Sequence, residues 1–286
     1  MRLLDSYISR MSAEVRSPST VRLFTFAAYA VMLLNALYFF PLRDLIWGPY
    51  SIGLSSHPEQ SVQVNFAYIL DHMRVYAKPA YFLYMAAILA SLLGLFKWVP
   101  RVLVFLIGWM LYYAFIPAFN SSFILYQLFA FFLIPVDAKA KSIFSITVTN
   151  FSFLACRIQF ILVYALAGMY KLSGKTWFEG SSVYYALHFD HFTPVWLRDL
   201  LVGNKWLMYL GNYFGLIYQL SFPLLIWFRK ARIPLFIAGA LFHGFIGAAM
   251  RLPEFALAMI FGYTLFFDDN LSEKILKKLR LSRTAL

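Results

Sequence analysis

The chain has 286 residues, of which 62% are hydrophobic, 20% aromatic and only 13% charged. Soluble domains carry about 25% charged residues, so this composition excludes a water-soluble fold and indicates a membrane protein. The net charge of +12 would suggest nucleic acid in a soluble chain. Membrane topology explains it better here, and we expect no nucleic-acid partner. The single cysteine, Cys156, excludes a disulfide framework and a cysteine-ligated metal site.

In chain order, residues 1–20 come first and are polar, with Leu3, Leu4, Tyr7, Ile8 and Met11 recurring on one helical face. We predict an amphipathic cytoplasmic segment that lies along the membrane surface. Residues 21–268 follow as one transmembrane domain, an all-α polytopic bundle with short interfacial helices. A membrane-crossing helix needs about 20 mainly apolar residues. Eight stretches approach this length: 24–40, 80–98, 102–119, 122–135, 151–169, 206–228, 234–250 and 253–267.

The distribution of Lys and Arg predicts the orientation of these spans. With eight spans, the side that holds both termini carries 16 of these residues and the opposite side carries 8. Positive charge accumulates on the cytoplasmic side of membrane proteins. We therefore expect a multi-pass protein of the cell (inner) membrane, with both termini cytoplasmic and the connection 172–205 on the extracytoplasmic side.

The tail, residues 269–286, is predicted to be a basic amphipathic cytoplasmic helix. Asn270 followed by Glu273 is a capping-box arrangement that would start this helix. Apolar residues on one face and lysines on the other are typical of a helix that binds anionic lipid. The lipid bilayer is thus an expected partner of the chain.

The fifth span has a polar stripe. Arg157, Tyr164, Gly168 and Lys171 are spaced 7, 4 and 3 apart, which keeps them on one helical face. This face is predicted to look into the bundle. Ionisable groups inside a bilayer are functional candidates by default. The alternatives are that Lys171 is a snorkelling anchor and that Arg157 is an anchor or structural ion-pair partner.

Further polar residues lie in other spans. Asn120 begins the fourth span, and the sixth contains Asn212 and Gln219. His243 in the seventh is flanked by Gly239 and Gly244, which permit close helix packing; it is either a site residue or a helix-packing residue. Most tyrosines are interpreted as interfacial belt residues. His188, Asp190 and His191 are weak as a metal signal, and we predict no metal.

The stretch LAGMYKLSGKTWFEG resembles the lysine motif of the vitamin K-dependent γ-glutamyl carboxylases and of the wider horizontally transferred transmembrane (HTTM) family. A second stretch, LFHGFIGAAMRLPEF, is similar to the Phe-His segment of that family and contains His243. A third and weaker likeness is NSSFILYQLFAFFLIPVDA, which begins at Asn120. The residues that match the lysine motif are Ala167, Gly168, Lys171, Leu172, Trp177, Glu179 and Gly180.

The resemblance implies a lysine site on the extracytoplasmic side. Lys171 would take a proton from a reduced quinone similar to vitamin K hydroquinone, and His243 would orient or share that proton. Burial disfavours the charged form of an amine, which is consistent with such a base. If the protein is an enzyme, the resemblance implies a carboxylase- or epoxidase-like lyase or oxidoreductase. The expected supporting residues are Trp177, Glu179, Gly180, Arg157, Asn120 and Tyr164.

The chain departs from the carboxylases in three ways. Four residues separate Leu172 from Trp177 where the carboxylases have three, and Ser121 and Ser122 follow Asn120 where they have a histidine. About 20 residues follow the last span, in place of a large extracytoplasmic domain. The chain is therefore interpreted as a bacterial short form that acts with a reduced quinone or on a secreted peptide and does not carboxylate glutamate. The alternatives are a non-catalytic membrane subunit or maturation factor, and a small-solute carrier.

Overall fold

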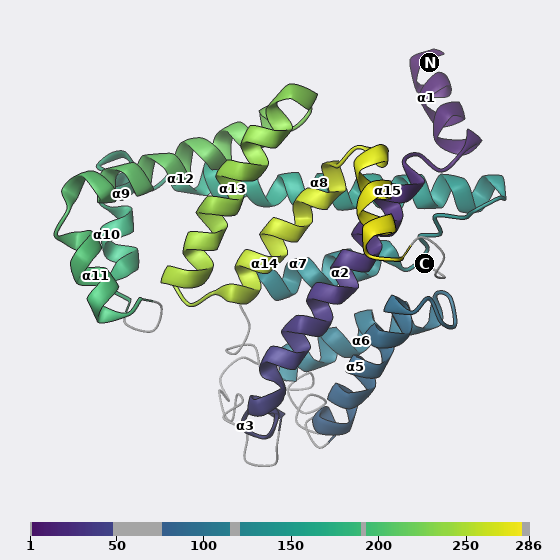
Figure 1. The fold of residues 1–286 in the computed structure, drawn as a ribbon, viewed down its shortest axis with the longest axis horizontal. Helices are drawn as coiled ribbons and strands as arrows, with labels where there is room; N and C mark the ends of the chain where they lie inside the picture. Colours follow the sequence, from purple (N-terminus) through teal and green to yellow (C-terminus); the bar gives the residue numbers. More distant parts are fainter. Residues whose placement is uncertain (1, 48–75, 115–120, 190–192, 282–286) are drawn as a thin grey trace, which may run out of the picture. The chain divides into compact units, whose positions relative to one another are not determined.

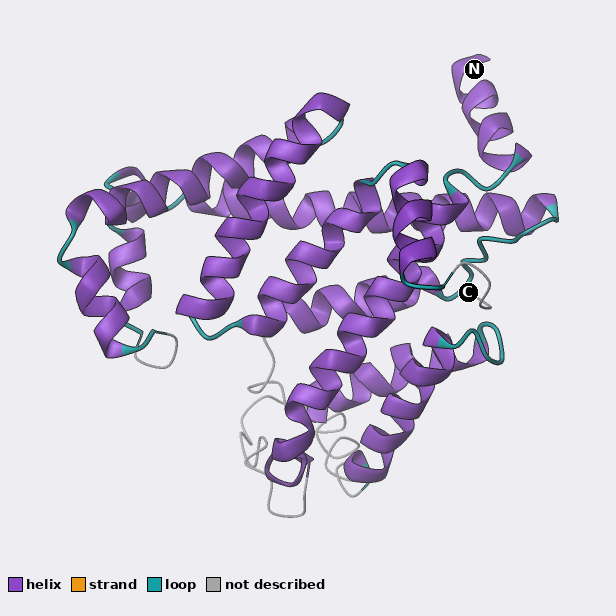
Figure 2. Ribbon diagram, viewed as in Figure 1, coloured by secondary structure: helices purple, strands orange, loops and turns teal. Residues whose placement is uncertain are grey.

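The computed structural model describes residues 2–47, 76–114, 121–189 and 193–281. Throughout these ranges the chain forms helices joined by loops, without a strand (Figure 2). The all-α prediction is confirmed to this extent. The chain divides into two compact units, Met1–Cys156 with Phe267–Leu286, and Arg157–Phe266.

The first unit is built around α2, whose neighbours are α5, α7 and α15; α6 lies beside both α5 and α7 (Figure 1). Its core contains Phe24, whose ring meets Phe129 and Phe153 edge to face at centroid distances of 5.1 and 5.9 Å. The elements are α1 (Arg2–Ala13), α2 (Pro18–Phe39), η1 (Phe40–Leu42), α3 (Arg43–Trp47), α5 (Ala77–Leu92), α6 (Val99–Ala114), α7 (Ser121–Leu133), residues 143–156 of α8 (Ile143–Leu172), and α15 (Asp269–Lys278).

The predicted N-terminal amphipathic helix is present as α1. Asn150 fastens the end of this helix, because its amide nitrogen donates to the carbonyls of Met11 and Glu14 at 2.8 Å. Its amide oxygen also accepts from the backbone N–H of Arg16 at 2.8 Å. Met11 is buried, whereas Tyr7 and Ile8 remain exposed, so part of the apolar face is free to meet lipid.

The C-terminal helix is also present, but the capping-box prediction is wrong. Helix α15 starts at Asp269, ahead of Asn270, and its N-cap residue is Asp268. The backbone N–H of Thr20 donates to Oδ1 of Asp269 at 2.9 Å, so a contact with α2 sets the start of α15. Glu273 instead pairs with Lys277 at 2.6 Å, and this lysine holds the pKa of Glu273 below its usual value.

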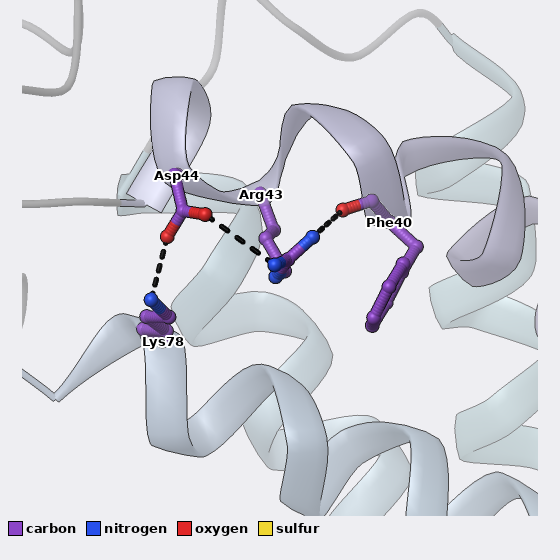
Figure 3. A network of polar contacts seen from close by, with 4 residues as sticks. All are labelled: Phe40, Arg43, Asp44 and Lys78. Carbon is purple, nitrogen blue, oxygen red and sulfur yellow. Dashed lines mark hydrogen bonds and ion pairs between the residues drawn. The ribbon is translucent and has the colours of Figure 1, made fainter.

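A small polar network joins α3 to the start of α5 (Figure 3). Asp44 lies between two cations, 3.5 Å from Arg43 and 2.6 Å from Lys78. Arg43 donates to the carbonyl of Phe40 at 2.8 Å and lies 4.3 Å above the Phe40 ring. Solvent screens exposed ion pairs, so the network orients this end of α2 and contributes little to the stability of the fold.

The second unit is built around α12, which contacts α9, α10, α11 and α13, while α13 also packs on α14 (Figure 1). Asn204 caps α12, since its side chain accepts from the N–H groups of Trp206 and Leu207. The elements are residues 157–172 of α8, α9 (Lys175–Phe178), α10 (Ser182–Leu187), α11 (Val195–Val202), α12 (Lys205–Leu225), α13 (Arg229–Ala249), α14 (Pro253–Gly262) and η3 (Tyr263–Phe266).

Each of the eight predicted apolar stretches contains a helix, but their lengths differ. Three segments are long and apolar enough to cross a membrane: Pro18–Ile46, Ile143–Leu172 and Arg229–Ala249. Others are shorter; α7 has 13 residues, which at 1.5 Å per residue is about 20 Å against a hydrocarbon core of about 30 Å. The structure therefore supports a membrane protein, and the count of eight spans stays a prediction.

Candidate functional site

The polar stripe of α8 faces the interior of the second unit. Tyr164 is buried, and Gly168 lies so close to α12 that a Cβ atom there would be 2.8 Å from Leu220. Arg157 uses its Nε–H to donate to the carbonyl of Leu265 at 2.8 Å, which is a structural role at the end of η3. Lys171 ends the stripe in the last turn of the helix.

Lys171 is half-buried and is held by neutral groups. Its Nζ donates to Oε1 of Gln219 at 2.6 Å and lies 4.7 Å from the ring centroid of Trp177. The nearby carboxylate of Glu179 is exposed and pairs with Lys175 at 3.4 Å. Within the described ranges, no carboxylate lies at ion-pair distance from Lys171. An ammonium held only by an amide and a ring is less strongly stabilised than an ion-paired one.

The loop that carries Trp177 is fastened to α12 by its backbone. Asn212 donates its amide N–H to the carbonyl of Trp177, and Tyr213 donates its hydroxyl to the carbonyl of Phe178, both at 2.8 Å. Gly180 adopts a φ of 77°, and a Cβ atom there would be 2.3 Å from the ring of Tyr209. Glycine is thus required at the turn that returns the loop to α12.

A chain of hydrogen bonds lies deeper in the same unit. His243 Nε2 is 2.9 Å from the hydroxyl of Tyr164, which is 3.0 Å from that of Tyr263. The hydroxyl of Tyr263 is 2.9 Å from that of Tyr218, which donates to the carbonyl of Leu235 at 3.1 Å. Tyr164 is seven residues, or about 10 Å of helix, before Lys171. His243 therefore belongs to a second level of the site, which lies deeper in the second unit than Lys171.

The two glycines beside His243 differ. A Cβ atom on Gly239 would be 1.8 Å from the hydroxyl oxygen of Tyr263 and 2.0 Å from that of Tyr218. Nothing lies within 4 Å of the corresponding position on Gly244. The prediction of close packing is confirmed at Gly239 and wrong at Gly244, because only Gly239 faces the tyrosine hydroxyls.

Asn120, a predicted supporting residue, lies outside the described residues, so its place relative to Lys171 stays a prediction. Asp190 and His191, which stand near His188 in the weak metal signal, also lie outside them. His188 has its Nδ1 2.8 Å from the carbonyl of Tyr184. Among the described residues, no three His, Cys, Asp or Glu side chains are grouped in a way that would hold a metal ion.

Sequence reasoning did not place three of the residues that complete the site. Gln219 was noted only as a polar residue of its span, although it lies seven residues after Asn212 and so shares its face of α12. This spacing predicts that Gln219 faces the same side as Asn212. Tyr218 is predicted only as one of the polar residues of its span, and Tyr263 falls under the general interpretation of tyrosines as interfacial belt residues; nothing in the sequence indicates that the two hydroxyls meet.

An apolar groove of about 880 Å³ runs between α12 and α13. Trp206 and Leu225 line it near the two ends of α12, and Tyr218 lines it between them. The ring of Tyr218 therefore borders the groove, while its hydroxyl joins the buried chain. The lining suits an apolar molecule of membrane-lipid dimensions.

A family model, the HTTM domain, matches residues 53–270, which is more than half of the chain. The chain belongs to the HTTM family. No curated protein and no solved structure matches it. The match includes Lys171 and its partners Trp177 and Gln219, together with the whole tyrosine–histidine chain. The predicted resemblance to the HTTM family is thus confirmed.

Proposed function

We propose that this HTTM protein is a membrane enzyme in which the amine of Lys171 acts as a base on a membrane-dissolved molecule. The proposal rests on the contacts of Lys171, which are an amide oxygen 2.6 Å away and an indole ring. The nearby carboxylate of Glu179 forms an ion pair with Lys175 instead. A carboxylate beside Lys171 would fix its positive charge, whereas neutral partners leave the amine able to exchange a proton.

A reduced quinone is the reactant that the family resemblance implies, and we propose that it reaches Lys171 from the apolar groove of the second unit. The groove between α12 and α13 has aromatic and aliphatic lining for its ring and tail. When bound, such a molecule supplies reducing electrons and an ionisable hydroxyl. Lys171 would accept a proton at Nζ, and Gln219 would hold the resulting ammonium through its amide oxygen. The ring of Trp177 would shield that charge from water.

The location of the site follows from the proposed topology. Eight spans with both termini cytoplasmic place the end of α8 on the extracytoplasmic side of the cell (inner) membrane. The 16-to-8 distribution of Lys and Arg supports this arrangement. A base in that position would be accessible to a membrane quinol and to a secreted peptide, so peptide maturation is the process that we propose. A non-catalytic maturation factor is the second candidate, since the contact of Lys171 with Trp177 also holds the loop in place.

The experiment that tests the proposal replaces Lys171 by arginine. Arginine keeps the positive charge and can still donate to Gln219, but guanidinium does not deprotonate in proteins. We expect Lys171→Arg and Lys171→Met to lose in vivo complementation, in the pathway that the neighbouring genes indicate, at unchanged protein level. The matched control is Lys175→Arg, because that side chain is 88% exposed. Full complementation by Lys171→Arg would show that the lysine is an anchor and would refute the enzyme.

We further propose that the reaction is not carboxylation of glutamate. Ser121 and Ser122 follow Asn120 where the carboxylases have a histidine. Incubation with reduced vitamin K, labelled bicarbonate and glutamyl peptides should therefore give no fixed label above background. Fixation that is present in the wild type and absent in Lys171→Arg would contradict this prediction and assign the carboxylase activity.

A further inference from the structure

The hydrogen-bonded network in the second unit, formed by His243, Tyr164, Tyr263 and Tyr218, has a fixed number of protons that its members can donate. Three hydroxyls, one imidazole and one backbone carbonyl make four hydrogen bonds. All four side chains are buried: Tyr164 and His243 are 1% exposed, Tyr263 3% and Tyr218 4%. Water therefore has little access to these four side chains. The hydrogen bonds of the network depend on the protons that the side chains themselves carry.

Starting from the carbonyl of Leu235, the proton count sets the donor and acceptor of every hydrogen bond. This carbonyl can only accept, so Tyr218 donates its one hydroxyl proton to it. Tyr263 must then donate to Tyr218, and Tyr164 must donate to Tyr263. No hydroxyl proton is left for the bond between Tyr164 and His243. That bond therefore uses an Nε2–H of the imidazole, which is 2.9 Å from the tyrosine oxygen.

The other ring nitrogen of His243, Nδ1, takes no part in this network. Nδ1 is buried and has no hydrogen-bond partner among the described residues. The rings of Phe242 and Phe255 lie beside the imidazole, at centroid distances of 5.0 and 5.6 Å. A protonated Nδ1 would need an acceptor in these apolar surroundings, so the imidazole is neutral and Nδ1 carries a free lone pair. A buried acceptor that is left unpaired is costly, which indicates that a donor completes it.

We infer that Tyr218, Tyr263 and Tyr164 hold His243 as the Nε2–H tautomer, so that Nδ1 accepts a hydrogen bond from a hydroxyl or N–H group of an apolar ligand. No covalent bond changes in this step, because the donor keeps its proton. The three tyrosines are positioning residues, and His243 is a ligand-binding acceptor. The assignment of the ligand rests on the proposed function, whereas the tautomer does not.

The tautomer is measured directly by ¹⁵N NMR on histidine-labelled protein in nanodiscs, with His243→Gln used to assign the resonances. We expect a protonated Nε2 and an unprotonated Nδ1 in the wild type. Tyr164→Phe removes the acceptor for Nε2–H and should give a mixture of tautomers. The matched control is Tyr213→Phe, which removes a hydroxyl that donates to the loop carbonyl of Phe178 and is not part of the histidine–tyrosine network. An Nδ1–H tautomer in the wild type, or an unchanged spectrum in Tyr164→Phe, would overturn the inference.

The acceptor role is tested by a matched pair of probes. Titration with 1-decanol should shift the Nδ1 resonance of His243, while decyl methyl ether, which has no donor, should leave it in place. Equal effects of the two probes, or no effect of either, would overturn the assignment of a donor ligand. In vivo, His243→Gln keeps a donor for Tyr164 but loses the Nδ1 acceptor, so complementation should fall at least tenfold at normal protein level. Full complementation by His243→Gln would also overturn it, whatever Lys171→Arg does.

Discussion

Lys171 and His243 use neutral polar partners, and this sets what each can do. Gln219 presents a carbonyl oxygen to the lysine, and Tyr164 presents a hydroxyl to the histidine. Amides and hydroxyls fix the direction of a side chain without fixing its charge, as a carboxylate would. The two levels of the site therefore combine rigid geometry with groups that can still exchange protons or hydrogen bonds with a ligand.

At the residue scale, Gly239 is predicted to be indispensable. A methyl group in Gly239→Ala would overlap the hydroxyls of Tyr263 and Tyr218, which both bond to other partners and cannot simply move away. Overpacking of this kind costs about 1–3 kcal/mol, so thermal unfolding in detergent should shift down by several degrees.

The control for this substitution lies five residues further along the same helix. Gly244→Ala has open space around the new methyl group and removes a helix-interior glycine, so it should leave the unfolding temperature equal or slightly higher. Equal unfolding temperatures for the two variants would mean that the hydroxyls do not pack against Gly239 as described.

Among the elements, helices were predictable where periodicity alone decides them, and their ends were not. The stripe on α8 was read from spacing, because a period of 3.6 residues fixes which side chains share a face. The start of α15 was misplaced because Asp269 binds the backbone of Thr20, nearly the whole chain length away in sequence. Contacts distant in sequence override local capping signals.

The docking of α15 on α2 gives a prediction at this scale. Asp269→Ala removes the acceptor for the N–H and hydroxyl of Thr20 and should release the tail. Limited trypsin digestion should then cut after Lys274, Lys277 and Lys278 several-fold faster than in the wild type. Glu273→Ala is the control: it loses an exposed pair with Lys277, which solvent screens, and should be cut at nearly the wild-type rate. Equal protection of the two variants would contradict the docking role of Asp269.

On the scale of the whole molecule, composition is enough to predict a helical membrane protein, and the HTTM match agrees with it. The number of crossings is harder to predict, because α7 and α14 have only 13 and 10 helical residues and a short apolar helix can cross, re-enter or pack inside a bundle. The spacing of Gln219 from Asn212 indicates its face of α12, but its pairing with Lys171 could not be predicted, since the two residues meet only once α8 and α12 have packed together.

The count of eight spans makes a prediction about the two ends of the fold. With Cys156 replaced by alanine, single cysteines at Ser181 and Ser282 should react with a membrane-impermeant maleimide from opposite sides of intact cells. Ser181 lies just beyond the Lys171 loop and should label from outside, whereas Ser282 follows α15 and should label only after the cells are opened. The reason is electrostatic, since 16 Lys and Arg residues would otherwise lie outside and only 8 inside. Labelling of both positions from one side would mean an even number of crossings between them instead of the predicted three, and Lys171 would then have to be assigned to the side on which Ser181 reacts.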